Sequence, residues 1–239
     1  MVKKIAIMSG KGGVGKSSIS ILLSTILSES YRVLLLDFDI CGPSCLLPLN
    51  VSGTIKKAEK GLVPLQVNKN LFVISMASMI KKEDAVIWRG PKKLSLLNLF
   101  YESINDYDYV IIDTPPGISE EHDFLIDKNI DVLIVTTSQN IALNDTEFAI
   151  NFCLKNKINI VGVVENMSGF KCECCGKINN IFAKRGGEFL ALEYNLQIIS
   201  TLPLETFFSK ILDTGEFLDR YKETKTYKLF RENVLKILS

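Results

Sequence analysis

A glycine-rich segment near the start of the sequence has the residue types that phosphate binding requires. Its pattern is G-x-x-x-x-G-K-[ST], in which glycines let successive backbone N–H groups turn inward around an anion. Lys16 would reach the β- and γ-phosphates, and the Ser17 hydroxyl would bind Mg²⁺. A chance glycine loop is the alternative, but an apolar run precedes the motif and a helical pattern follows it. We therefore predict an ATP site formed by Gly10, Lys11, Gly12, Gly13, Val14, Gly15, Lys16 and Ser17.

Three aspartates follow apolar runs that read as strands. Asp37 and Asp39 end one run, and Asp113 ends another. Ligand sites in open parallel sheets gather at the carboxyl ends of strands, so these acids should lie near the phosphates. We expect Asp113 to hold Mg²⁺ through water, Asp39 to orient the attacking water, and Asp37 to support the metal shell. Capping of turns or helices is the alternative role for each acid.

The rest of the chain supplies alternating strands and helices to position these groups. We expect strands at 4–8, 32–37, 71–75, 109–113, 132–136, 158–164 and 197–201, and helices at 16–29, 91–104, 142–156, 187–194 and 225–238. This alternation predicts an α/β fold with a mostly parallel sheet and helices on both faces. Without a linker, repeat or low-complexity segment, the 239 residues read as a single P-loop ATPase domain.

The overall composition indicates which kinds of partner to expect. The formal net charge is +1, which does not suggest a nucleic-acid partner. No run approaches the roughly 20 apolar residues of a membrane span, and no signal peptide is visible, so we expect a cytoplasmic protein without membrane contact. In a reducing compartment we expect the six cysteines to be thiols or metal ligands and not disulfides. Three of the cysteines fall within four positions, at Cys172, Cys174 and Cys175.

Several strings together resemble the Mrp/ApbC family of iron–sulfur cluster carrier ATPases, including its cytosolic assembly factors of the nucleotide-binding-protein type. The second lysine of the phosphate loop also resembles the deviant Walker A subclass of P-loop proteins. The resemblance covers nearly the whole chain, and DTPPG-x-S-x-E-H and ENMSGF are its most specific motifs. The matching segments are 8–18, 37–44, 86–91, 113–122, 165–176 and 186–193.

The resemblance implies roles for individual residues. Lys11 would cross a dimer interface to the partner's nucleotide, although a solvated lysine is the simpler alternative. Asp39 would belong to the first switch and Asp113 to the second, and with Lys11 and Lys16 they form the expected catalytic set. Asn166 and the turn at Pro203 would meet the adenine ring. His122, the only histidine, is interpreted as a positioning residue.

This chain departs from the family in places. Residues 183–187 replace a more glycine-rich run, Cys41 stands where a tyrosine is more usual, and Cys174 adds a thiol inside the CxxC. Cys174 is either a bystander or a substitute ligand.

The CxxC formed by Cys172 and Cys175, in a segment at about 166–180, predicts a shared metal site. A [4Fe–4S] cluster needs about four cysteine ligands, and one chain supplies two here, so a two-fold dimer would complete the set. The resemblance implies the same arrangement. A shared structural zinc or a redox CxxC is the alternative.

The two features together predict an ATP-dependent carrier or scaffold that delivers clusters to apo iron–sulfur proteins. The phosphate loop begins nine residues after Met1, so the chain resembles the shorter class of the family. That class pairs with itself or with a longer paralogue.

Two other classes share this kind of loop. A positioning ATPase of the MinD/ParA type would want a membrane-binding tail or a basic DNA face. The amphipathic stretch at 227–238 could be such a tail, but a last helix packed on the sheet is the simpler interpretation, and the CxxC would then be unused or a zinc site. In a nitrogenase-reductase-like protein the ligand cysteines are far apart in sequence, unlike the CxxC of this chain.

Overall fold

The strands of the central sheet are apolar on both sides because helices cover both of its faces. In β1 (Lys3–Met8), Ile5 and Ile7 point into one hydrophobic core, and Ala6 and Met8 point into the other. Every residue of β2 (Val33–Asp37) and β7 (Tyr109–Asp113) is buried. The computed structural model describes residues 2–39, 42, 44–75, 78, 90–126, 128–172 and 174–238.

The sheet has eight strands in the order β12-β9-β8-β1-β7-β2-β6-β5. All neighbouring strands are parallel except β5 and β6, which are antiparallel. The remaining strands of this sheet are β5 (Leu65–Gln66), β6 (Leu71–Ser75), β8 (Asp131–Thr136), β9 (Ile160–Glu165) and β12 (Ile198–Thr201). The parallel order brings the carboxyl ends of β1, β2 and β7 side by side, where the phosphate loop and the aspartates lie.

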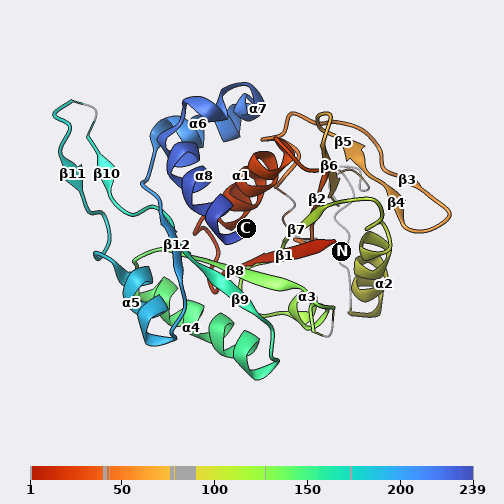
Figure 1. Cartoon of the computed structure of the whole chain (residues 1–239), viewed down its shortest axis with the longest axis horizontal. Helices are drawn as coiled ribbons and strands as arrows, with labels where there is room; N and C mark the ends of the chain where they lie inside the picture. Colours follow the sequence, from red (N-terminus) through yellow and green to blue (C-terminus); the bar gives the residue numbers. More distant parts are fainter. Residues whose placement is uncertain are drawn as a thin grey trace.

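Two helical layers sandwich the sheet (Figure 1). One face is covered mainly by α1 (Lys16–Ser28), α6 (Thr206–Thr214), α7 (Phe217–Arg220) and α8 (Lys225–Leu238). The other is covered mainly by α2 (Gly90–Tyr101), α4 (Asn140–Lys155) and α5 (Gly186–Glu193), with the short α3 (Glu120–Asp123) beside α2. A 3-10 turn, η2 (Tyr221–Glu223), joins α7 to α8.

Two small antiparallel ribbons lie outside the main sheet. One pairs β3 (Lys56–Lys57) with β4 (Leu62–Val63), and the other pairs β10 (Phe170–Lys171) with β11 (Ile178–Asn179). Figure 1 shows the β10–β11 ribbon extending away from the helical layers. The second ribbon carries the CxxC at its tip.

The structure confirms the expected α/β fold and most of the expected elements, and β6, β7 and α8 occupy the ranges that the sequence predicts. The expected strand at 158–164 was wrong at its start, because β9 begins at Ile160. Lys157 has a left-handed φ of 56°, and the Ile158 N–H donates to the Cys153 carbonyl, so residues 157 and 158 belong to the turn that ends α4. The sequence interpretation also omitted the shorter elements α3, α6, α7, β3, β4, β5, β10 and β11.

Candidate nucleotide site and cysteine hairpin

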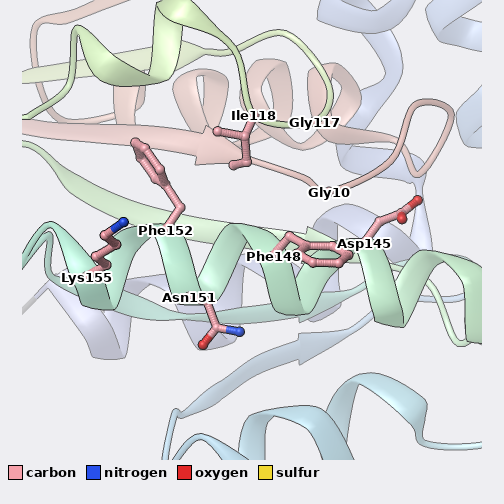
Figure 2. A pocket seen from close by; sticks show the side chains of 8 residues that line it. All are labelled: Gly10, Gly117, Ile118, Asp145, Phe148, Asn151, Phe152 and Lys155. Carbon is pink, nitrogen blue, oxygen red and sulfur yellow. The ribbon is translucent and has the colours of Figure 1, made fainter.

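The phosphate loop connects β1 to α1, and two of its glycines occupy places where a side chain would not fit. A Cβ on Gly10 would lie 2.0 Å from the Asp145 carbonyl oxygen of α4, and Figure 2 shows the two residues side by side. Gly15 has a φ of +88°, and a Cβ there would lie 2.2 Å from the Asn166 Nδ2. The loop therefore has the glycine-dependent form of an anion cradle, and α1 begins directly after it.

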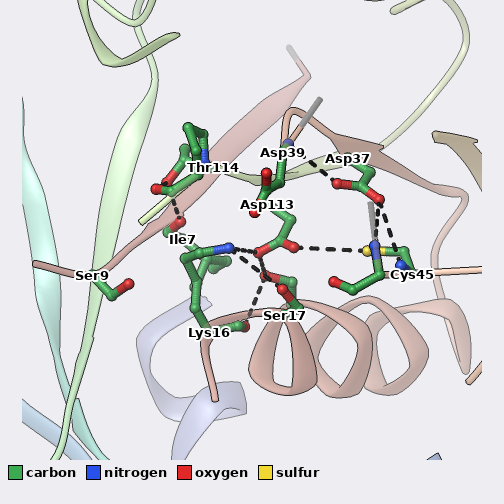
Figure 3. A network of polar contacts seen from close by, with 12 residues as sticks. Ile7, Ser9, Lys16, Ser17, Asp37, Asp39, Cys45, Asp113 and Thr114 are labelled. Atoms are coloured by element: carbon green, nitrogen blue, oxygen red, sulfur yellow. Dashed lines mark hydrogen bonds and ion pairs between the residues drawn. The ribbon is translucent and has the colours of Figure 1, made fainter. Parts of the chain in front are cut away.

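Lys16 is buried and is held by Asp113 at the end of β7. Its Nζ lies 2.7 Å from Asp113 Oδ1, and the Ser20 hydroxyl donates to the same oxygen at 2.8 Å (Figure 3). The neighbouring Ser17 hydroxyl lies 3.4 Å from the Lys16 Nζ. The two residues expected to contact phosphate and Mg²⁺ are thus side by side, beside the predicted second-switch acid.

Asp37 lies next to Asp113 because β2 and β7 pair with these two residues in register. Its carboxylate accepts hydrogen bonds from the Ser75 hydroxyl at 2.9 Å and from the backbone N–H groups of Asp39 and Ser44, both at 3.2 Å. Burial, and then the nearby Asp113 carboxylate, raise the pKa of Asp37 to about 7. A cation would relieve this proximity of two buried acids, which suits the metal-shell role expected of Asp37.

Cys45 completes this buried group and was not given a role from the sequence. Its Sγ is 3.8 Å from Asp113 Oδ2, and ligand atoms of Asp37, Cys45 and Asp113 all lie within 4.8 Å of one another. Burial, followed by the two carboxylates, raises the pKa of the Cys45 thiol well above its ordinary value. The thiol is therefore protonated and acts as a weak donor to Asp113. Its position after the Asp37–Asp39 run was the only signal in the sequence.

Asp39 and Lys11 lie on the open side of the loop. Together with Lys16, Ser17 and Pro116 they line a small pocket of about 190 Å³. Asp39 Oδ1 accepts the Gly42 N–H at 3.0 Å, which fixes the carboxylate at the mouth of the loop. The first-switch residue Cys41 lies outside the described residues, as do residues 86–89 of the family-like segment.

His122 holds the segment that follows Asp113. Its Nδ1 accepts the Ser119 N–H at 3.1 Å in a capping box, and its Nε2 lies 3.2 Å from the Thr114 hydroxyl. That hydroxyl donates to the Ile7 carbonyl at 2.8 Å, so the histidine donates through Nε2. Burial lowers the pKa of His122 to about 4, which keeps the ring neutral. The geometry agrees with a positioning role.

Asn166 joins the far side of the loop to the end of β9. Its Nδ2 donates to the Val14 carbonyl at 2.9 Å. The Ser168 N–H donates to the Leu202 carbonyl at 2.7 Å, so the segments before Pro203 and after Asn166 lie together. The structure thus places Asn166 against the phosphate loop and the turn at Pro203 beside the segment that follows Asn166.

The CxxC lies on the tight turn between β10 and β11. The Gly176 N–H donates to the Cys172 carbonyl at 2.8 Å, and the Cys172 N–H donates to the Lys177 carbonyl at 2.9 Å. Cys172 is half-buried, Cys174 and Cys175 are exposed, and none of the five cysteines in the described residues forms a disulfide. Exposed thiols on one turn suit a thiophilic metal group.

One chain does not assemble a four-thiolate site by itself in the part of the structure that is described. There, the only group of three or more metal-ligating side chains within mutual reach is Asp37, Cys45 and Asp113.

Comparison with known families decides the relationship. Residues 1–238 match the family model described as ParA, the NUBPL iron-transfer P-loop NTPases. The chain belongs to this family. A "Cytosolic Fe-S cluster assembly factor Nubp2 homolog" from Aedes aegypti is 45% identical over 224 residues, covering 89% of this chain and 86% of that protein. The "Cytosolic Fe-S cluster assembly factor NBP35" of Kluyveromyces lactis is 44% identical over 235 residues, covering 92% of this chain and 72% of that protein.

Two solved structures share the fold of this chain. A nucleotide-binding protein from Archaeoglobus fulgidus, in complex with ADP and with cobalt found in it, superposes with a TM-score of 0.75 at 27% identity, covering 95% of this chain and 91% of that one. The septum site-determining protein MinD from Pyrococcus horikoshii has a TM-score of 0.73 at 20% identity, covering 99% and 96%. The MinD likeness shows the shared fold. Within the described residues, no helix combines the length and apolar character of a membrane span.

Proposed function

We propose that this chain is a cytosolic, ATP-dependent iron–sulfur cluster assembly factor that holds a [4Fe–4S] cluster as cargo and passes it to apo-proteins. The proposal treats residues 1–239 as a single P-loop ATPase domain. The relatives' names supply the assembly role and the cytosol. The single observation that carries the rest is that the CxxC hairpin is connected directly to the phosphate loop.

A short run of residues, held by hydrogen bonds, connects the phosphate loop to the hairpin. Asn166 binds Val14 of the loop, and four residues later the chain enters β10. Phe170 of β10 forms a bridge with Leu204, whose N–H donates to the Gly169 carbonyl at 2.9 Å. A shift of the phosphate loop would therefore move the base of the hairpin as well. ATP could in this way regulate the holding or release of cargo at the hairpin tip.

We infer the following roles at the nucleotide. Lys16 and the loop N–H groups would bind the phosphates, and Lys11 would contact the nucleotide of a facing copy. Mg²⁺ held near Ser17 and Asp37 would neutralise phosphate charge. Asp39 would orient the attacking water. Lys16 leaves Asp113 when it binds phosphate, so Asp113 becomes available to the water shell of the cation.

Two copies must meet for the cargo site to be complete, because each contributes Cys172 and Cys175. A homodimer, or a complex with a longer paralogue, satisfies this requirement equally. Apo iron–sulfur proteins are the recipients in this proposal.

The test is anaerobic reconstitution with iron and sulfide, followed by absorption spectroscopy and metal analysis. We expect about four irons per dimer, and loss of that iron in Cys172→Ala or Cys175→Ala. Release of the cluster to an apo-protein should change on addition of ATP and Mg²⁺ in the wild type but not in Lys16→Ala. Stoichiometric zinc with no iron uptake would refute the cluster assignment.

A further inference from the structure

The outer face of α4 carries a row of side chains at coiled-coil spacing, of which Ile141, Phe148 and Lys155 are exposed, whereas Phe152 packs partly against the core and His122. Ile141, Asp145, Phe148, Phe152 and Lys155 are separated by four, three, four and three residues. Phe148 is 68% exposed and Ile141 59% exposed, and both lie on the same face of the helix. Asn151 donates to the Tyr194 hydroxyl, so it is turned away from this row toward α5.

The row borders a groove of about 500 Å³ whose opposite wall is the segment that follows Asp113. Gly117 and Ile118 form that wall, and Gly10 of the phosphate loop lies at one end. Figure 2 shows the Phe152 ring reaching toward Ile118, with Asp145 and Lys155 toward opposite ends of the helix. The groove is therefore apolar in its middle, acidic at one end and basic at the other.

The charges of the two ends are available to a partner. Across the described part of the chain, neither Asp145 nor Lys155 forms an ion pair. Ten residues of helix separate them, or about 15 Å, so they do not neutralise each other. An occupant with the opposite polarity, basic near Asp145 and acidic near Lys155, would satisfy both.

A second copy of α4 in the antiparallel direction has this polarity. The midpoint between residues 145 and 155 is position 150, and the midpoint between 148 and 152 is also position 150. One two-fold axis through this point therefore pairs Asp145 with the partner's Lys155 and, at the same time, Phe148 with the partner's Phe152. Self-complementarity about a single axis is the requirement for an isologous contact.

We propose that α4 is a self-association surface, through which two copies of this chain pair antiparallel. Each Phe148 would fill the groove of the other copy between Phe152 and Ile118. The antiparallel arrangement sends the two phosphate loops to opposite ends of the helix pair, so this contact differs from the proposed nucleotide-dependent dimer, in which Lys11 would reach the partner's nucleotide.

The strength of the contact follows from its size. Two helices of 16 residues bury less than the roughly 800 Å² per partner of a standard interface, so we expect micromolar association. The charged ends would set direction and register more than affinity.

The experiment is sedimentation velocity of the full-length chain across the micromolar range. It uses a C172S/C175S background without nucleotide and with chelator, so the cysteine-bridged dimer of the proposed function does not contribute. The D145K and K155D variants should each associate at least about tenfold more weakly, because like charges then face each other at both ends. The D145K/K155D double variant should recover association.

The decisive experiment mixes the two single-charge variants. In an equimolar mixture of D145K and K155D, each end of a mixed pair joins one lysine to one aspartate, so a heterodimer should form although neither variant pairs with itself. F148E should abolish association in every combination, with circular dichroism showing that the fold is intact. A chain that stays monomeric throughout, equal association of all variants, or a mixture no tighter than its parts would overturn the proposal.

Discussion

The Lys16 ammonium lies 2.7 Å from the Asp113 carboxylate, and both side chains are buried. In this structure the lysine expected to bind phosphate is the counter-ion of two adjacent buried acids, Asp37 and Asp113. In the proposed function, nucleotide binding would therefore exchange one partner of Lys16 for another, and the acids would then require a cation of their own. This exchange explains in physical terms why nucleotide and Mg²⁺ would bind together.

Removing the Lys16 ammonium should destabilise the nucleotide-free protein. Lys16→Ala leaves a buried carboxylate without its counter-ion, which costs about 3–5 kcal/mol of unfolding free energy. Urea unfolding in the presence of chelator measures the loss. Lys11→Ala is the matched control, because Lys11 forms no ion pair with the described residues and should change stability by less than 1 kcal/mol or so.

A double-mutant cycle separates this ion pair from a general packing effect. Asp113→Asn removes the charge that Lys16 neutralises, so Lys16→Ala should cost less in that background than in the wild type. Additive losses would show that the two side chains do not interact energetically.

Gly15→Ala should weaken ATP binding while leaving the fold intact. The left-handed φ of +88° and the overlap with Asn166 together impose strain of about 1–3 kcal/mol, which corresponds to roughly five- to 140-fold in affinity. Gly12→Ala should lose less, because a Cβ there meets only Pro116 at 3.8 Å and more. Isothermal titration of ATP with Mg²⁺ compares the two.

The Gly15→Ala defect should be partly relieved by a second change. Asn166→Ala removes the atom that the new Cβ overlaps but leaves the φ strain, so the double variant should bind ATP more tightly than Gly15→Ala alone. If Asn166→Ala worsens binding in that background as much as in the wild type, the overlap is not the cause.

The sequence predicted the sheet, most helices and the loop because these depend on local patterns. Unbroken apolar runs such as 109–113 indicate buried parallel strands, and the glycine–lysine spacing is contiguous. The contact between Asp37 and Asp113 depends instead on the pairing of β2 with β7. The sequence predicts that these acids lie at the same edge of the sheet, but not that their strands are neighbours. The burial of Cys45 beneath these acids and the groove beside α4 depend on how distant segments pack, and no local pattern encodes them.

Cys174 should be dispensable for cluster binding. It lies exposed within the CxxC turn, whereas Cys172 and Cys175 of two copies would already supply four thiolates in the proposed dimer. Reconstituted Cys174→Ser should retain about four irons per dimer, and Cys172→Ser and Cys175→Ser should lose them. An equal loss of iron in Cys174→Ser would make this residue a ligand.

Two buried groups should give the stability of the protein opposing dependences on pH. The pKa of His122 is lowered by burial from 6.5 to about 4, so only the unfolded chain takes up the proton between these values. The free energy of unfolding then falls as the pH drops through this window, by up to about 3 kcal/mol. Asp37 acts in the opposite sense. Its pKa rises from 3.8 to about 7 through burial and the Asp113 carboxylate, so its contribution is lost progressively as the pH rises from about 4 to about 7.

Substituting one group should reveal the slope of the other. In His122→Gln the free energy of unfolding should decrease as the pH is raised from about 4 to about 7, because of the two opposing contributions only that of Asp37 remains. In Asp37→Asn it should increase over the same range. Urea unfolding at several pH values, with chelator and without nucleotide, measures both slopes. Because Lys16 also faces the two acids, the Asp37 contribution is measured most directly as the difference between Asp37→Asn and the wild type at each pH. Parallel pH profiles for the two variants would contradict the assignment of opposite signs.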